Sequence, residues 1–503
     1  MITFIVALVV LVVGYVLYGT FVEKIFGIDP KAETPAITKN DGVDFVPMSG
    51  WRIFLVQFLN IAGLGPIFGA IMGIFFGPAA FLWIVFGTIF AGGVHDYLSG
   101  MLSLRKGGVS LPEIVGSELG SGVRVFMRVL SLVLLLLLTT TFLSGPATLL
   151  QGLAPLGTMP FHGRALPIAW VLIIFAYYAL ATVLPVDKLI GRFYPIFGGM
   201  LLFMGIGIAV VMLAKHGSAM PELTDGLQNR KADGLPLFPM MFVSIACGAI
   251  SGFHGTQSPI MSRCLTNERQ GRWIFYGAMV AEGILALIWA AAAGTFFADP
   301  EQGLDGIGGL QAFASHYDRG TNLPALIVDK VSRSWLGTVG GVLAIIGVIA
   351  APITSGDTAL RSARLIVADF LHIDQKPKMK RLMIALPLFL CVFALVFVNF
   401  EIVWRYFSWT NQTLAMFTLW AGTVWLYRNQ KSEIRNQKYS FGYLIALIPA
   451  LFMTMVSTSY ILIAPEGFRL PEQYRWIGYA IAGVITLACL CGFTFWARNY
   501  KTK

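Results

Sequence analysis

Two apolar segments of the chain are interrupted by glycine and proline, which releases backbone groups that can bind a ligand. The first segment reads NIAGLGPIFGA over residues 60–70 and contains Gly63, Gly65 and Pro66. Both residue types free backbone N–H and carbonyl groups from helical pairing, and lipid offers such groups no partner. The freed carbonyls suit a cation, and the N–H groups that start the next half-helix suit a carboxylate.

The second interrupted segment also carries polar side chains. It reads ACGAISGFHGTQSPI over residues 246–260. Interruptions at corresponding positions of two halves are typical of a transporter binding site. We therefore expect unwinding at Gly63, Gly65 and Gly255, and we predict a substrate-binding set made of Gly63, Gly65, His254, Gly255, Gln257 and, from a later segment, Asn411. The alternative is that the glycines only permit close packing of helices.

Three further ionisable side chains fall inside apolar segments. His95 and Asp96 lie in the segment 79–103, and Glu282 lies in the segment 274–298. A titratable group in a membrane helix is costly, so these three residues indicate a coupling or proton pathway. The alternative is structural, with Asp96 capping a helix or pairing with a buried arginine, and Glu282 in an ion pair.

The elements that must position these residues are membrane-spanning helices. The chain has 503 residues, of which 56% are hydrophobic and 12% charged, whereas soluble domains carry about 25% charged residues. Apolar stretches of about 18 residues or more are typical of spanning helices. The sequence thus predicts an all-α membrane protein with about thirteen spans, at 2–22, 53–75, 79–103, 123–152, 166–184, 194–214, 237–258, 274–298, 336–358, 382–399, 401–427, 441–463 and 475–497.

The interrupted segments lie in the second and seventh spans, which the span order places in opposite orientations. A sequence echo accompanies them, because WIVFGTIFAGG (83–93) and WIFYGAMVAEG (273–283) share Trp, Ile and Gly positions at a constant offset of 190. We therefore predict two inverted five-helix repeats, at 53–214 and 237–427. An extra helix at 1–22, a cytoplasmic loop at 23–52 and two extra helices at 441–497 lie outside them.

The net charge of +10 does not indicate a nucleic-acid partner, because the basic residues follow the membrane topology. Most of the 36 Lys and Arg residues fall in loops after odd-numbered spans and in the C-terminal tail, and such an excess marks the cytoplasmic side. We expect a multi-pass protein of the bacterial inner membrane with its N-terminus outside and its C-terminus in the cytoplasm. The expected partners are a small-molecule substrate and membrane lipid; the sequence assigns no oligomeric state.

The sequence contains no motif for ATP hydrolysis or covalent catalysis. No glycine is followed by lysine, and neither a His-Glu-x-x-His nor a Gly-x-Ser-x-Gly pattern occurs, so a P-loop, a zinc protease site and a nucleophile elbow are all excluded. We expect no enzyme activity and no cofactor apart from Na⁺ or H⁺ as a coupling ion. A polytopic chain of this kind is most simply a secondary transporter; a channel and a ligand-binding membrane sensor are the alternatives.

A set of motifs resembles the carbon starvation protein A (CstA) family of membrane transporters, specifically a shorter subgroup. The motifs are TPA (34–36), DGVDFVP (41–47), IAGLGPI (61–67), VHD (94–96), CGAISGFHGTQSP (247–259), SGDTALR (355–361) and WRYFSWTNQ (404–412). The resemblance implies uptake of peptides or pyruvate and a leucine-transporter (LeuT) type of five-plus-five inverted repeat. It also implies a candidate sodium site, in which Thr354 and Ser355 join carbonyls of the first interrupted helix.

The chain departs from the longer members of that family. Those members carry a histidine pair shortly before the IAG motif, where this chain has Val56 and Gln57. The longer members also extend further at their C-terminal end. We therefore expect a cation-coupled importer that works by alternating access and takes either a peptide or a small carboxylate such as pyruvate.

Overall fold

Apolar helices make up most of the structure, a computed structural model that describes residues 1–42, 44–161, 164–183, 186–317, 321–373, 377–429 and 441–501. The N-terminal helix runs through α1 (Ile2–Gly14), the π-helical turn η1 (Tyr15–Gly19) and α2 (Thr20–Phe26). After the short α3 (Pro35–Thr38), the second span consists of α4 (Gly50–Ile61) and α5 (Leu64–Ile74). The first predicted interruption is therefore present as a break between two helices.

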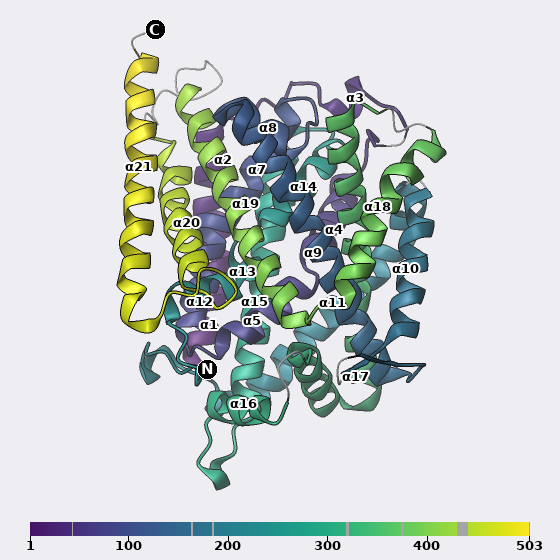
Figure 1. The fold of residues 1–503 in the computed structure, drawn as a ribbon, viewed down its shortest axis with the longest axis vertical. Helices are drawn as coiled ribbons and strands as arrows, with labels where there is room; N and C mark the ends of the chain where they lie inside the picture. Colours follow the sequence, from purple (N-terminus) through teal and green to yellow (C-terminus); the bar gives the residue numbers. More distant parts are fainter. Residues whose placement is uncertain are drawn as a thin grey trace.

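The next part of the chain is also mostly helical. Its helices are α6 (Ala79–Leu82), the π-helix η2 (Trp83–Gly92), α7 (Gly93–Arg105), α8 (Leu111–Leu119), α9 (Ser121–Leu153), α10 (Ile168–Val183) and α11 (Val186–Lys215). A two-stranded antiparallel hairpin, β1 (Met159–Phe161) and β2 (Arg164–Leu166), joins α9 to α10. Figure 1 shows this hairpin at the end of the bundle that also carries α16.

The seventh predicted span is divided into three helices: α12 (Leu237–Ser244), α13 (Ala246–Ala249) and α14 (Gly252–Ser262). The remaining elements are η6 (Arg272–Tyr276), α15 (Gly277–Phe296), α16 (Gly306–Ser315), α17 (Leu323–Leu371), α18 (Lys378–Val396), α19 (Phe400–Arg428), α20 (Leu444–Ile463) and α21 (Arg475–Lys501). α17 bends at Gly337, whose φ of 69° favours glycine. Short 3-10 turns lie at Gly217–Ala219, Leu223–Asp225, Glu268–Gln270, Pro300–Gln302 and Glu472–Tyr474.

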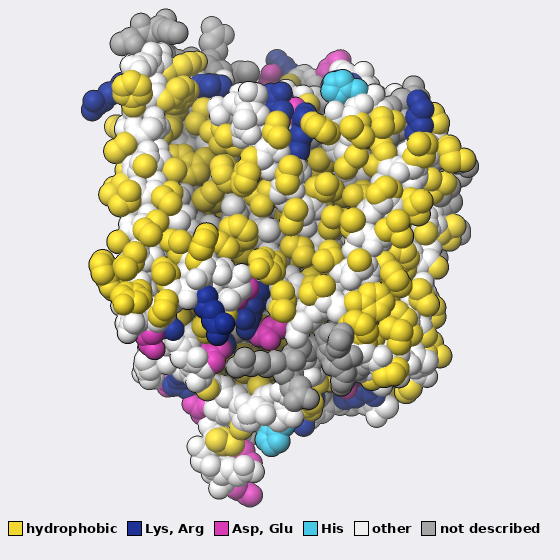
Figure 2. Space-filling view, viewed as in Figure 1, with side chains coloured by type: hydrophobic (Ala, Val, Ile, Leu, Met, Phe, Trp, Pro, Cys, Tyr) yellow, Lys and Arg dark blue, Asp and Glu magenta, His cyan; other side chains and the backbone are white. Residues whose placement is uncertain are grey.

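The helices pack into one bundle whose outer surface is suited to lipid. α17 packs extensively against α9 and α11, and α19 packs against α20. In Figure 2 a broad band of hydrophobic side chains covers the middle of the visible face, and most charged side chains lie toward its two ends. The N-terminus lies toward one end of the bundle and the C-terminal helix ends at the other (Figure 1).

The count of thirteen spans is not confirmed. In the described parts of the chain, nine helices are long and apolar enough to cross a membrane, and the pair α4–α5 makes a tenth if it is one span. Three expected segments are helical but fall outside this set. The described apolar part of α10, Ile168–Ala181, is shorter, the segment 237–258 is divided, and α19 mixes Ser, Thr, Asn and Gln with its apolar residues.

The sequence echo has a structural counterpart. η2 begins at Trp83 and η6 begins at Arg272, so both echoed segments contain π-helical turns near their shared Trp-Ile pair. The half-helices that follow the two breaks, α5 and α14, each have 11 residues. The division into two five-helix repeats, with its boundaries, stays a prediction.

Candidate functional site

The first break lies at Ala62 and Gly63, and the two half-helices differ in direction by 44°. Pro66 lies in the first turn of α5, where the backbone N–H has no helical partner in any case, so the proline is compatible with a helix start. Gly65 is helical, and its predicted unwinding is wrong. The residue has a packing role instead, because a Cβ there would overlap the side chain of Cys247 from α13.

The second break lies at Ile250 and Ser251, whose backbone is extended between α13 and α14. Asn411 of α19 completes this break, because its Oδ1 accepts hydrogen bonds from the Phe253 N–H at 2.7 Å and from the Ser251 hydroxyl at 3.1 Å. The amide oxygen thus satisfies N–H and hydroxyl groups at the start of α14, as a capping side chain does within one helix. We predicted that Asn411 contacts the substrate. In this structure its amide oxygen instead binds Phe253 and Ser251 of the same chain.

A buried cluster of two histidines and two carboxylates lies beside the second break. The Asp96 carboxylate is 2.8 Å from Nδ1 of His95 and 2.9 Å from Nδ1 of His254. Nε2 of His254 is 3.2 Å from Oε2 of Glu282, a close ion contact whose orientation is not that of a hydrogen bond. All four side chains are fully buried. The structure thus brings together four residues that the sequence places in three separate spans.

The helices α7, α14 and α15 position this cluster. His95 and Asp96 lie in the first turn of α7, His254 in the first turn of α14, and Glu282 within α15. Gly255 is also helical, so the prediction that it unwinds is wrong. Its missing side chain makes room for the imidazole of His95, since a Cβ at Gly255 would lie 3.2 Å from its Nε2.

The composition of the cluster suits it to carry a proton. With both carboxylates ionised and His254 protonated, the three groups bear one net negative charge, and burying such charge costs several kcal/mol. A further proton on Glu282 removes it. A protonated imidazole is attracted to both carboxylates, whereas a neutral one carries no charge, so the number of protons in the cluster controls how strongly His254 holds Asp96 and Glu282 together.

The two hydroxyls of the candidate sodium site have different surroundings. Ser355 lies at the first break: its hydroxyl is 2.8 Å from the Asn60 carbonyl oxygen and 3.3 Å from that of Leu59, both in the last turn of α4. The Thr354 hydroxyl donates to the Ala351 carbonyl of its own helix at 2.7 Å. Oxygen atoms are the ligands that hard cations prefer. The arrangement at Ser355 therefore fits a small cation better than the arrangement at Thr354.

Glutamine side chains occupy the interior between α4, α14 and α17. Gln257 donates from Nε2 to the Ser362 hydroxyl at 3.2 Å, and Gln57 donates from Nε2 to the Ser258 hydroxyl at 3.3 Å. Within the described part of the chain, neither amide oxygen has a hydrogen-bond partner. Gln57 drew attention in the sequence only as a departure from the family pattern. Its buried amide is a contributor to the site that sequence reasoning missed.

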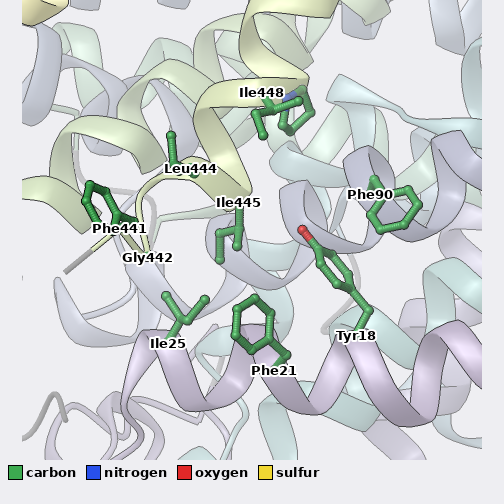
Figure 3. A pocket seen from close by; sticks show the side chains of 10 residues that line it. Tyr18, Phe21, Ile25, Phe90, Phe441, Gly442, Leu444, Ile445 and Ile448 are labelled. Atoms are coloured by element: carbon green, nitrogen blue, oxygen red, sulfur yellow. The ribbon is translucent and has the colours of Figure 1, made fainter. Parts of the chain in front are cut away.

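One cavity lies apart from the polar interior. This cavity, of about 530 Å³, is lined by apolar side chains of the first helix, η2 and α20, with the Tyr18 ring among them (Figure 3). It contains none of the predicted site residues. Among the described residues, no group of three or more His, Cys, Asp or Glu side chains has the arrangement of a metal site.

Known proteins of similar sequence include membrane transporters. An uncharacterized membrane protein of Haemophilus influenzae is 46% identical, over 61% of this chain and 94% of its own length. The peptide transporter CstA of Campylobacter jejuni is 30% identical, over 56% of this chain and 48% of its own. The pyruvate/proton symporter BtsT of Escherichia coli is 28% identical, over 64% of this chain and 53% of its own. The chain spans about half the length of these two transporters.

A solved structure of similar fold and a family model complete the comparison. A mutant of the manganese transporter of Eremococcus coleocola has a TM-score of 0.56 at 14% identity, and the match covers 89% of this chain and 93% of that one. At this identity the similarity concerns the fold alone. The model of the family described as carbon starvation protein CstA matches residues 1–162 and 162–305. The chain therefore belongs to the carbon starvation protein CstA family.

Proposed function

We propose that this protein is a proton-coupled importer of a small carboxylate or a short peptide. It works by alternating access in the bacterial inner membrane, with its N-terminus outside and its C-terminus in the cytoplasm. Two relatives support the substrate class, since one is named a peptide transporter and the other a pyruvate/proton symporter.

The observation that carries this proposal is the fully buried bridge from Asp96 through His254 to Glu282. It joins α7 and α15 to the half-helix that follows the second break. A proton that enters from outside neutralises Glu282 and weakens its attraction to His254. α14 then moves more freely against α15, and loss of the proton to the cytoplasm restores the bridge. Proton movement is thereby linked to the position of a broken helix.

The LeuT type of inverted repeat belongs to the same proposal. Breaks in the second and seventh spans, half-helices of equal length after them and π-helical turns in both echoed segments support it. In such an arrangement the two broken helices hold the substrate near the middle of the membrane. The predicted binding residues Gly63 and Gln257 lie in or beside these helices.

Sodium is the second candidate for the coupling ion. The Ser355 hydroxyl and the carbonyl oxygens of Leu59 and Asn60 would hold it, joining α17 to the end of α4. A set of neutral oxygens contains no group that titrates near pH 7. The two candidates therefore differ in their dependence on pH and on Na⁺.

Reconstitution into proteoliposomes tests the proposal. Labelled pyruvate, other small carboxylates, dipeptides and tripeptides are offered under a proton gradient, a sodium gradient or neither. We expect one of these substrates to accumulate under the proton gradient alone, with saturation and counterflow. Flux without counterflow would indicate a channel, and binding without flux would indicate a sensor; either result contradicts the proposal.

Variants of the buried bridge provide the second arm of this test. We expect Glu282→Gln to abolish proton-driven accumulation while counterflow of unlabelled for labelled substrate continues. Glu472→Gln, which makes the same change at an exposed position, is the matched control. Undiminished accumulation in Glu282→Gln would exclude Glu282 as the proton carrier.

A further inference from the structure

Arg361 is a buried cation with little to bind inside the protein. Its side chain lies in α17 and is 7% exposed. Within the described residues, its one hydrogen bond runs from Nη2 to the Ala181 carbonyl oxygen at 3.5 Å, the limit of a hydrogen bond, and its Nε has no partner. Among the described residues, no carboxylate oxygen lies within the 4.0 Å of an ion pair with it.

The missing ion pair is notable because a carboxylate lies one helical turn away. Asp357 and Arg361 are four residues apart on α17, a spacing at which opposite charges readily pair on a helix. Asp357 is also buried, at 4% exposure, and it interacts with Arg361 and Arg364 through their charges without close contact to Arg361. The negative charge of Asp357 therefore partly offsets the positive charge of Arg361. It leaves the guanidinium N–H donors of Arg361 available.

A buried guanidinium with available donors is costly unless a ligand uses them. Arginine stays charged under all ordinary conditions and presents five N–H donors in a planar fork. That fork matches a carboxylate, with two parallel charge-assisted hydrogen bonds. An ionisable group inside a membrane protein is therefore a functional hypothesis in its own right.

The surroundings of Arg361 belong to the same polar interior as the breaks. Its neighbour Ser362 accepts a hydrogen bond from Gln257 of α14, whose amide oxygen has no partner among the described residues. Ser355, at the first break, lies six residues earlier on α17, or about 9 Å along the helix axis. Arg361 thus lies beyond the breaks on the helix that contacts the first of them and, in the predicted topology, toward the cytoplasm.

We propose that Arg361 binds the carboxylate of the transported substrate. This inference rests on the proposed import function and narrows its substrate class, since pyruvate and the C-terminus of a peptide share that group. Arg361 receives the carboxylate on the cytoplasmic side of the breaks. A neutral amide of the same shape lacks the charge that the guanidinium binds, so it is a poor substrate.

Matched acids and amides test this assignment. Initial rates of uptake are measured in proteoliposomes for pyruvate and pyruvamide, and for a dipeptide and its C-terminal amide. In Arg361→Gln we expect the KM for the acids to rise by roughly 10- to 100-fold, the range of one lost bidentate charged contact, with little change for the amides. Arg361→Lys keeps the charge without the fork, and we expect an intermediate KM.

The controls separate this proposal from the proposed function. Arg333→Gln makes the same change on α17 at an arginine paired with Asp329, and we expect parental KM values. If Arg361→Gln takes up the acids with the parental KM, the carboxylate assignment is wrong and the proposed import function still stands. The parent protein can also bind the acids through Arg361 without accumulating them under a proton gradient. That result overturns the proposed proton coupling and leaves the carboxylate assignment in place. A parent that binds none of the acids overturns both. If Arg361→Gln fails to insert, the same acid-to-amide comparison is decided with Arg361→Lys.

Discussion

At the scale of single residues, the function of each polar side chain depends on whether the protein already satisfies its hydrogen bonds. Asn411 has its oxygen occupied by Phe253 and Ser251, so its role is to hold α14. The amide oxygens of Gln57 and Gln257 have no partner in the described parts of the chain. These two glutamines are therefore better placed than Asn411 to contact a substrate.

The two predicted sodium ligands are expected to differ when each is mutated. Ser355→Ala removes the hydroxyl that contacts the Asn60 carbonyl, whereas Thr354→Val removes one that contacts only its own helix. If sodium binds here, Ser355→Ala will weaken sodium-driven uptake at least tenfold, which corresponds to about 1.4 kcal/mol, and Thr354→Val will change it little. Uptake is measured against sodium concentration at constant pH. Equal behaviour of both variants and the parent would make the hydroxyls structural.

A second prediction at this scale concerns Gly255. A Cβ there would lie 3.2 Å from His95 and 3.0 Å from Leu111, so Gly255→Ala presses on the buried imidazole. We expect the pH dependence of uptake to shift while the protein still inserts and binds substrate. The control is Gly483→Ala, where no atom of the described residues lies within 4 Å of the added methyl group. A pH profile identical to that of the parent would show that His95 takes no part in coupling.

At the scale of elements, the broken helices are held together by contacts between them. α5 and α13 approach so closely that Gly65 abuts Cys247, and α14 is capped by a side chain from α19. Neither contact exists within one helix. The breaks are thus maintained by neighbouring helices, as membrane helices with Gly and Pro require.

The contact between α5 and α13 predicts a rescue. Gly65→Ala places a methyl group against Cys247, and overpacking of this kind costs about 1–3 kcal/mol. We expect a lower Tm and impaired transport, with both partly restored by adding Cys247→Gly. Thermal unfolding in detergent measures the first and uptake the second. Failure of the double variant to recover would show that the two helices do not depend on this contact.

Because Asn411 caps α14, its removal should lower the stability of the protein without removing a contact to the substrate. Asn411→Ala leaves the buried Phe253 N–H without its acceptor, which costs about 1–3 kcal/mol. We expect a lower Tm than for Asn429→Ala, at the partly buried C-cap of the same helix, where the side chain donates only to the Trp425 carbonyl of its own helix among the described residues. An unchanged Tm, combined with loss of substrate binding, would instead favour the original prediction that Asn411 contacts the substrate.

At the scale of the whole molecule, the membrane topology stays a prediction. The distribution of Lys and Arg indicates an external N-terminus, and the structure places the two termini toward opposite ends of the bundle (Figure 1). Impermeant thiol reagents should therefore label Glu301→Cys from outside and Lys31→Cys from the cytoplasm. Both introduced cysteines lie at exposed positions. Labelling of both from one side would contradict the predicted topology.

The sequence by itself determined the class of the molecule and the existence of its two breaks. Long hydrophobic stretches indicate membrane helices, because only apolar side chains and a fully hydrogen-bonded backbone are stable in lipid. Gly together with Pro marks the places where such helices are interrupted. The family membership followed from motifs that lie along most of the chain. These signals are local, so one sequence was sufficient to read them.

Only the tertiary structure decided which residues unwind and which side chains meet. The breaks fall at Ala62–Gly63 and Ile250–Ser251, while Gly65 and Gly255 are helical, because the roles of these last two glycines depend on Cys247 and His95 across a helix interface. The histidine–carboxylate cluster joins positions more than 150 residues apart. Helical periodicity gives the face on which a residue lies but not the helix that it faces, and packing among many apolar helices made that choice.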